Sequence, residues 1–263
     1  MHILITRPEP DASETRRLLE GEGHTADVAP MLEISVGAPE SDLLAAASAL
    51  VVTSRNGLRA LEQADLPEWL LSLPVLVVGR STGAAARALG FRDVTVGPAT
   101  AKDLVPLIVA AWTEKIVTKG GMPGPVLHLS GDKISFDLLP PMTQAGIAFA
   151  RSTVYHSSPA RDLPTHVRAC LERGGYDAII LMSPLSADTF VQLVMRLQLA
   201  EGARRAAYVC FSNGIAQRLA SLGAEQVYVA AKPNIEEVLA LISSLAAQSG
   251  PLSPPGKKSD SNS

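Results

Sequence analysis

The chain has 263 residues, of which 47% are hydrophobic and 19% charged, with a formal net charge of −3 and a mean hydropathy of +0.19. This composition predicts a globular protein and excludes a disordered chain, which would be poor in apolar residues and high in net charge. Because acids and bases nearly balance, the protein lacks the positive field that general nucleic-acid binding requires.

Cysteine and histidine spacing predicts neither a metal site nor a disulfide framework. Cys170 and Cys210 form no C-x-x-C pair, and the five histidines lack ligand spacing. Met1 leads directly into a strand-like segment with no export signal, and the longest apolar run, residues 104–112, is too short to span a membrane. We therefore expect a cytoplasmic protein that binds neither membranes nor nucleic acid.

Short apolar runs alternate with longer Ala- and Leu-rich stretches, a pattern typical of βα units that build a mainly parallel sheet. The predicted strands cover residues 3–6, 26–29, 50–53, 75–79, 94–96, 126–130, 148–155, 178–182, 207–211 and 226–229. The predicted helices cover residues 11–19, 57–61, 82–89, 102–112, 138–145, 187–197, 215–222 and 235–245. Gly90 and Gly223 follow two of these helices, where a left-handed residue is expected.

The second half of the chain repeats elements of the first half in the same order. Residues 51–54 are echoed by 180–183, residues 75–90 by 208–223, and the opening strand at 3–6 by 127–130. Three echoes in one order indicate two similar lobes, each near the commonest domain size. Sequence order alone leaves open whether the lobes are consecutive or have exchanged an element.

Two segments have the composition of connectors. Residues 120–125 are turn-rich and lie between the two repeats. Residues 249–263 are low in complexity, and we expect them to form a disordered tail.

Small hydroxyl-bearing residues follow the predicted strands, where doubly wound sheets bind their ligands. Each such turn precedes a helix, so hydroxyl groups and free backbone N–H groups converge, an arrangement suited to carboxylate or phosphate groups. The alternative is that each residue is an ordinary helix N-cap. The turns contain Thr53, Ser54, Arg55, Asn56, Ser81, Thr82, Gly131, Ser183, Ser186, Ser212 and Asn213.

Tyr155, at the end of a predicted strand, is the most suggestive catalytic group because these turns contain one acid and no histidine or cysteine. A tyrosine hydroxyl can donate a proton to a leaving group, although a strand tyrosine is more often a packing residue. The motif at residues 79–83 fits the G-x-S-x-G of serine hydrolases. No histidine is well placed to complete a triad, so a hydrolase is disfavoured.

Motifs in sequence order resemble the uroporphyrinogen-III synthase family over residues 1–245. They are ILITRP at 3–8, PMLEI at 30–34, VVTSRN at 51–56, VG at 78–79 with Thr82 and Gly90, LSGD at 129–132, VY at 154–155, SP at 183–184, and Ala230 with Pro233. The chain departs from the family where threonine is common, at Ile215, and where arginine is common, at Ser135.

The resemblance implies an α/β fold of two similar flavodoxin-like (Rossmann-like) parallel-sheet lobes joined by a two-stranded β-ladder. Residues 1–33 and 157–246 would form one lobe and residues 36–152 the other, with residues 34–36 and 152–155 as crossing strands. It further implies an enzyme without metal or organic cofactor, which cyclises hydroxymethylbilane, a linear tetrapyrrole with several carboxylates, while inverting ring D and losing water. We expect the protein to be a monomer.

By the same resemblance, Tyr155 would assist departure of the substrate hydroxyl. Arg7 and the hydroxyl-rich turns would bind the substrate carboxylates, and the protein would impose one folded geometry on a reactive intermediate. A non-catalytic two-lobed protein that binds a small polyanion is the alternative.

Overall fold

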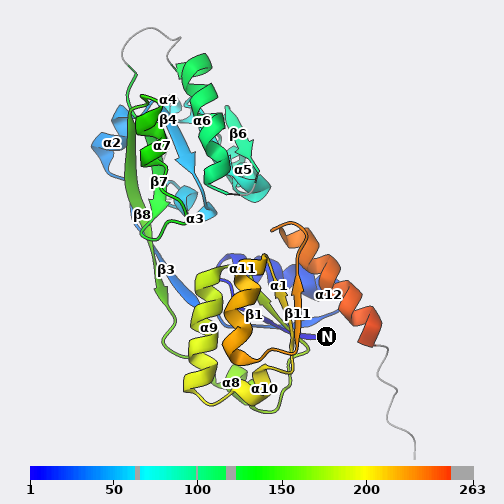
Figure 1. Ribbon diagram of the computed structural model, residues 1–263. Helices are drawn as coiled ribbons and strands as arrows, with labels where there is room; N and C mark the ends of the chain where they lie inside the picture. The colour runs from blue at the N-terminus through cyan, green and yellow to red at the C-terminus, as the bar shows by residue number, and fades with distance from the viewer. Residues whose placement is uncertain (63–65, 99, 117–122, 250–263) are drawn as a thin grey trace, which may run out of the picture. The chain divides into compact units, whose positions relative to one another are not determined.

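A computed structural model describes residues 1–62, 66–98, 100–116 and 123–249, and it divides the chain into two units (Figure 1). Unit 1 comprises Met1–Glu33 with Pro159–Ser263, and unit 2 comprises Ile34–Ser158. Each unit is built on its own sheet, and the predicted α/β class is confirmed. Residues 120–122 of the connector and residues 250–263 of the proposed tail lie outside the described residues.

The sheet of unit 1 has five parallel strands in the order β2-β1-β9-β10-β11. These strands are β1 (His2–Ile5), β2 (Thr25–Val28), β9 (Ala178–Leu181), β10 (Ala207–Cys210) and β11 (Gln226–Val229). Counted along the unit, this is the 2-1-3-4-5 order of flavodoxin-like folds.

Helices cover both faces of this sheet, and the strand residues alternate between two cores. In β1, Ile3 and Ile5 pack with α1 (Asp11–Gly21) and α12 (Ile235–Ser249). Leu4 faces the opposite core. That core contains side chains of α8 (Thr165–Glu172), α9 (Pro184–Arg196), α10 (Ala200–Ala203), α11 (Asn213–Ala216) and the 3-10 helix η4 (Gln217–Leu222).

The sheet of unit 2 has the order β3-β8-β7-β4-β5-β6, in which the last five strands are mutually parallel. They are β3 (Leu32–Val36), β4 (Ala49–Val52), β5 (Val75–Val78), β6 (Val94–Gly97), β7 (Val126–Gly131) and β8 (Phe149–Pro159). Around the β3 and β8 pair, Gly37 N donates to Val154 O and Ala160 N donates to Met31 O. The residue numbers of β8 fall as those of β3 rise along the pair, so the two strands are antiparallel.

Two cores again flank the unit 2 sheet. In β4, Leu50 and Val52 face the core formed with α2 (Ser41–Ala46), α3 (Arg55–Arg59), α4 (Glu68–Leu71) and α5 (Gly79–Ala88). Ala49 and Val51 face the core formed with η1 (Lys102–Leu104), α6 (Val105–Ala111) and α7 (Leu139–Gln144). A π-helical turn, η2 (Trp112–Ile116), follows α6. The sheet is therefore fixed from both sides, and its strand ends are rigid supports for side chains.

The ten predicted strands are confirmed within a few residues at each end. Gly90 and Gly223 have the expected positive φ angles, +98° and +67°. Four helices begin earlier than predicted: α3 at Arg55, α5 at Gly79, α9 at Pro184 and α11 at Asn213. Six residues expected in the turns therefore lie in the first turns of helices: Arg55, Asn56, Ser81, Thr82, Ser186 and Asn213.

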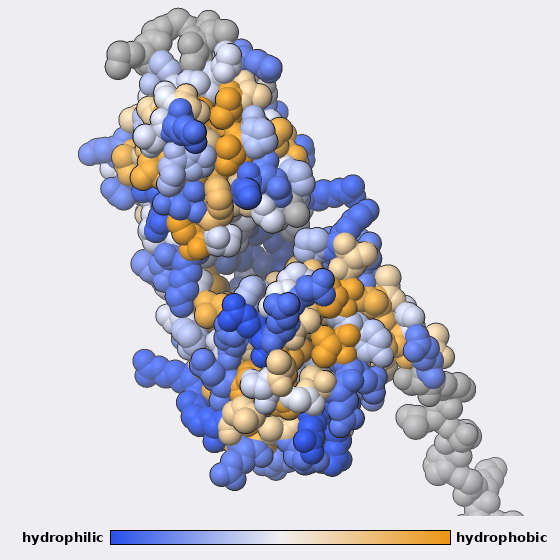
Figure 2. Space-filling model, viewed as in Figure 1, coloured by the Kyte–Doolittle hydropathy of each residue, from blue (hydrophilic) through white to orange (hydrophobic). Residues whose placement is uncertain are grey.

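The described surface is mostly hydrophilic where Figure 2 shows it. The exposed large apolar side chains come from different elements: Leu18, Val36, Trp69, Leu139, Met195 and Val227. Within the described residues, no helix is both long and apolar enough to cross a membrane.

Candidate active site in unit 2

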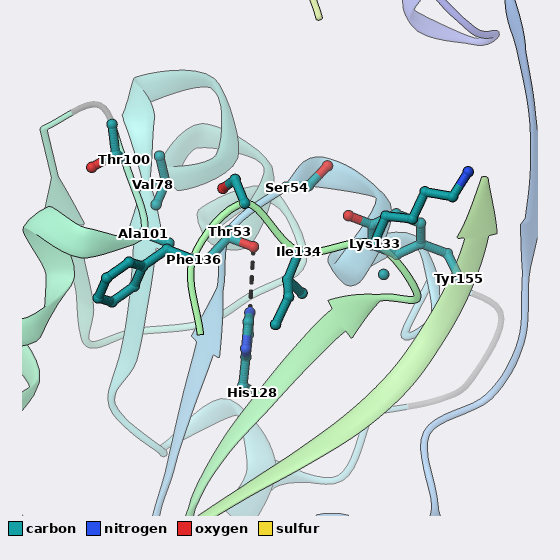
Figure 3. Close-up of a pocket in the computed structure, with 12 residues that line it drawn as sticks. Thr53, Ser54, Val78, Thr100, Ala101, His128, Lys133, Ile134, Phe136 and Tyr155 are labelled. Carbon is teal, nitrogen blue, oxygen red and sulfur yellow. Dashed lines mark hydrogen bonds between the residues drawn. The ribbon is translucent and has the colours of Figure 1, made fainter. Parts of the chain in front are cut away.

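A cavity of about 270 Å³ opens at the carboxyl ends of the unit 2 strands (Figure 3). This edge, where the strand order changes direction between β4 and β7, is the ligand-binding edge of doubly wound sheets. Its lining residues are Thr53, Ser54, Val78, Thr100, Ala101, His128, Gly131, Lys133, Ile134, Ser135, Phe136 and Tyr155. Four residues singled out in the sequence therefore lie together here: Thr53, Ser54, Gly131 and Tyr155.

A β-bulge and a glycine position Tyr155. The register of β7 and β8 shifts between Ser130 and Gly131, so that Gly131 pairs with Tyr155 and one extra residue of β8 is accommodated. Bulges redirect side chains, and here Val154 and Tyr155 both pack toward the same core. A Cβ atom on Gly131 would lie 2.5 Å from Cε2 of Tyr155 and 2.6 Å from Cζ. Only glycine at 131 leaves room for the ring.

The Tyr155 hydroxyl is held as a neutral donor. Burial raises the pKa of Tyr155, and the negative charge of Asp132 raises it further, while hydrogen bonds from Ser54 and from the Gly131 backbone act in the opposite direction. Ser54 is the N-cap of α3, and its hydroxyl oxygen also accepts from Asn56 N at 3.3 Å. Ser54 therefore caps α3 and lines the cavity at the same time.

His128 lies at the floor of the cavity in β7, with 2% of its surface exposed. Its Nε2 atom is 3.3 Å from Oγ1 of Thr53, as the dashed line in Figure 3 marks. Burial lowers the pKa of His128 to about 4, and the positive charge of Arg151 contributes in the same direction. The imidazole is thus neutral at physiological pH.

Lys133 is the only lysine, arginine, aspartate or glutamate among the described lining residues. It lies beside Tyr155, on the opposite side of the cavity from Phe136 (Figure 3). The neighbouring carboxylate of Asp132 is turned to other groups, because Oδ1 accepts from Ser157 N at 3.0 Å and Oδ2 lies 3.8 Å from His156 Nδ1. The cavity thus combines hydroxyl groups with one positive charge and suits a carboxylate.

The remaining predicted unit 2 residues do not line this cavity. Arg55 and Asn56 belong to α3, and Asn56 Oδ1 accepts from Arg59. Ser81 and Thr82 belong to the first turns of α5, where Thr82 is buried and Ser81 is exposed. Ser81 therefore does not occupy the strand-to-helix turn that a hydrolase nucleophile requires.

The predicted residues of unit 1 lie at the carboxyl ends of its strands. Arg7 follows β1, where its guanidinium lies 3.0 Å from Asp11 Oδ2 and donates to Thr15 Oγ1 at 3.1 Å. Ser183 caps α9: its oxygen accepts from Ser186 N at 3.1 Å, and its hydroxyl donates to Ser186 Oγ at 2.8 Å. Ser212 is the N-cap residue of α11 but makes no side-chain cap bond, and Asn213 begins that helix.

Sequence reasoning missed His128 as a cavity residue. It was placed correctly in a strand, and the signal that could have identified its role is the single imidazole in the run Val-Leu-His-Leu-Ser. Strand alternation puts His128 on the same face as Val126 and Ser130. A polar side chain near the ligand-binding end of this strand could therefore have been predicted. Phe136, Thr100 and Ala101 reach the cavity from loops, and no periodic pattern marks them.

The five parallel strands of each unit have the flavodoxin-like order, and those of unit 2 carry a hydroxyl-lined cavity at their carboxyl edge, which defines a two-unit α/β protein. The chain matches the family described as uroporphyrinogen-III synthase HemD over residues 13–240. It therefore belongs to the uroporphyrinogen-III synthase family, and the activity expected from the sequence is that of its family.

Solved structures of similar fold agree with this assignment. Uroporphyrinogen-III synthetase from Helicobacter pylori has a TM-score of 0.59 at 20% identity, with 93% of this chain and 99% of that chain covered. A mutant uroporphyrinogen III synthase from the extremely thermophilic bacterium Thermus thermophilus has a TM-score of 0.56 at 18% identity, with 94% and 99% covered. A search of curated proteins found no match. At these identities the likeness shows the shared fold.

Proposed function

We propose that this uroporphyrinogen-III synthase binds its linear tetrapyrrole with the reacting end in the unit 2 cavity, and that Tyr155 is the catalytic residue. The observation that carries this proposal is the arrangement around the Tyr155 oxygen. That oxygen lies in the cavity lining beside Gly131, and burial raises the pKa of Tyr155, which keeps its proton in place at neutral pH. The Tyr155 O–H is therefore left to donate to a ligand.

The chemistry follows from that free donor. As the carbon–oxygen bond of the terminal hydroxymethyl group breaks, the oxygen gains negative charge, and a hydrogen bond from Tyr155 stabilises it. The oxygen takes the Tyr155 proton and leaves as water, while the electron pair of the pyrrole nitrogen forms a double bond to the carbon left behind. The pyrrole N–H proton then passes to the tyrosinate, which restores Tyr155 and leaves a neutral azafulvene. Ring closure with inversion of ring D then depends on how the chain is folded in the site, which is a proximity and orientation effect.

Carboxylate binding is the second part of the proposal. Thr53 and Lys133 would bind a carboxylate in the cavity, and the other predicted residues would bind further carboxylates of the same substrate. These other residues are Arg7, Arg55, Asn56, Ser81, Thr82, Ser183, Ser186, Ser212 and Asn213. Arg7 would bind as part of its pair with Asp11, because its guanidinium already contacts that carboxylate.

The first test uses freshly generated hydroxymethylbilane, followed by oxidation and chromatographic separation of the uroporphyrin isomers. The uncatalysed reaction gives isomer I and serves as an internal control. We expect isomer III in proportion to the protein added. Isomer I alone, from folded protein, would favour the non-catalytic binding protein and refute the proposed function.

Tyr155→Phe tests the role of the hydroxyl. We expect kcat to fall by about 100-fold, in the range of general-acid assistance, while some isomer III still forms because folding of the substrate persists. Tyr228→Phe is the matched control, since that hydroxyl lies in unit 1 and contacts Gln226. Unchanged kcat in Tyr155→Phe, or complete loss of activity from a folded variant, would contradict the assignment.

We further propose the finer organisation expected from the sequence. The lobes would comprise residues 1–33 with 157–246 and residues 36–152, related by an internal repeat, in a cytoplasmic monomer. The repeat is supported by strand order: the segments that echo one another occupy equivalent positions in β11-β10-β9-β1-β2 and β6-β5-β4-β7-β8.

A further inference from the structure

The pair formed by His128 and Thr53 is part of the cavity but has no role in the chemistry assigned to Tyr155. His128 projects from β7, and Thr53 follows β4, the adjacent strand. Their side chains meet at 3.3 Å between Nε2 and Oγ1. Both residues line the cavity, so a buried imidazole contacts a hydroxyl group that a bound ligand can reach.

The direction of this hydrogen bond decides what Thr53 can offer a ligand. A hydroxyl group has one hydrogen and two lone pairs, and a neutral imidazole has one N–H and one bare nitrogen. If Thr53 donates to His128, its hydrogen is used and only lone pairs face the cavity, which would repel a carboxylate. If His128 donates through Nε2, the Thr53 hydrogen is free to point into the cavity.

We propose that His128 is a positioning residue whose Nε2–H donates to Thr53 and thereby turns the Thr53 hydroxyl into a fixed donor for a substrate carboxylate. This inference rests on the proposed function, because it specifies the tautomer of His128 in the same site. It extends that function by assigning a task to a residue that need not touch the substrate.

The surroundings of His128 favour a fixed, neutral ring. Its side chain is enclosed, and the ring of Phe149 lies 6.3 Å away between centroids. Arg151 is its register partner on β8, and a neighbouring positive charge disfavours an imidazolium. A neutral ring has one proton to place, so a single tautomer sets the orientation of Thr53.

A double-mutant cycle tests the coupling. His128→Leu removes the hydrogen bond at similar volume, and Thr53→Val removes the hydroxyl at nearly constant shape. We expect each to lower kcat/KM for isomer III formation by about tenfold or more, the size expected for one hydrogen bond to a charged group, mainly through KM. Because His128 acts through Thr53, the double variant should be no worse than Thr53→Val alone.

Two further variants keep the test independent of folding. His128→Gln retains an N–H near the position of Nε2, and we expect it to restore activity relative to His128→Leu. Thr95→Val, in β6 and outside the cavity lining, is the control for loss of a threonine hydroxyl. Additive losses in the cycle, or unchanged kcat/KM in folded His128→Leu, would overturn the inference.

The tautomer itself gives a readout that does not depend on turnover. Long-range ¹H–¹⁵N correlation spectra of the wild-type protein, with the His128 signal assigned by its absence in His128→Gln, distinguish Nε2–H from Nδ1–H. We expect Nε2–H, and the Nδ1–H tautomer would overturn the inference even if the enzyme is active. A wild-type protein that forms only isomer I would instead refute the proposed function.

Discussion

At the scale of single residues, the contact between Gly131 and Tyr155 is the tightest constraint in the cavity. The ring occupies the space in which any other residue at 131 would place its Cβ atom. The bulge that brings Tyr155 into this position leaves no alternative path for the ring without a shift of β8. The position of the Tyr155 ring thus depends on residue 131 having no side chain.

Gly131→Ala is expected to displace the Tyr155 ring and to lower kcat by at least the factor lost in Tyr155→Phe. Overpacking of this kind costs about 1–3 kcal/mol of unfolding free energy, which urea denaturation would measure. Gly37→Ala is the matched control, because a Cβ atom there meets nothing within 4 Å. Wild-type kcat in Gly131→Ala would show that the ring has another productive position.

His128 makes stability depend on pH. Its pKa is about 4 in the folded protein, below the ordinary value of 6.5, so the unfolded chain binds more protons between these values. The stabilisation is fully present above about pH 6.5 and is lost as the pH falls toward 4. The expected loss is about 3 kcal/mol between pH 7 and pH 4.

Urea unfolding of wild type and His128→Gln at both pH values isolates this contribution, because the variant lacks the titrating group. Arg151 and Asp137, the charged groups that act on His128, are the same in both proteins. An equal loss of unfolding free energy in the two proteins would mean that His128 is not the group responsible.

At the scale of elements, the serine residues after the strands divide into those that cap helices and those that do not. Ser183 makes a cap bond to α9, a helix of 13 residues. Ser212 stands at the same position of α11 without such a bond. The sequence presented capping and ligand binding as alternatives, but Ser54 both caps α3 and lines the cavity, so one residue can serve both roles.

Ser183→Ala is therefore expected to lower the unfolding free energy by about 1 kcal/mol, the usual value of an N-cap. Ser212→Ala is the matched control and should cost markedly less, since no cap bond is lost. Thermal or urea unfolding of the two variants gives the comparison. Equal costs would indicate that the side-chain cap contributes nothing to α9.

The central strands were predictable because they are short apolar runs whose residues are buried on both faces, as in β4 and β9. The short helices α2, α4 and α10 were not, because one turn of four to six residues leaves too little periodicity. α8 was also missed, although its buried residues Val167, Cys170 and Leu171 have the i, i+3, i+4 spacing of a helix.

The site was predictable to the extent that it lies at strand ends. Thr53, Ser54 and Gly131 follow or end strands, so the α/β topology alone indicated one edge for them. Tyr155 was expected at a strand end, but β8 continues to Pro159 and Tyr155 reaches the cavity opposite Gly131. The bulge in β8 was not derivable, because it depends on pairing with β7 and not on local sequence. The same holds for Phe136 and Thr100, which reach the cavity from loops.

At the scale of the whole molecule, the two units have separate cores built on equivalent strand orders. No residue of the two unit 1 clusters occurs in the two unit 2 clusters. Unit 2 is continuous in sequence, whereas unit 1 is assembled from both ends of the chain. All the residues that line the cavity belong to unit 2.

Residues 34–158 alone are therefore expected to fold cooperatively and to retain the cavity, including the hydrogen bond between Thr53 and His128. Circular dichroism and the His128 tautomer signal would report on this. The fragment should give only isomer I, because it lacks the predicted carboxylate-binding residues Arg7, Ser183, Ser186, Ser212 and Asn213. Isomer III from the fragment would place the whole reaction in one unit and leave those residues without a role, whereas an unfolded fragment would mean that the unit 2 core cannot stabilise itself.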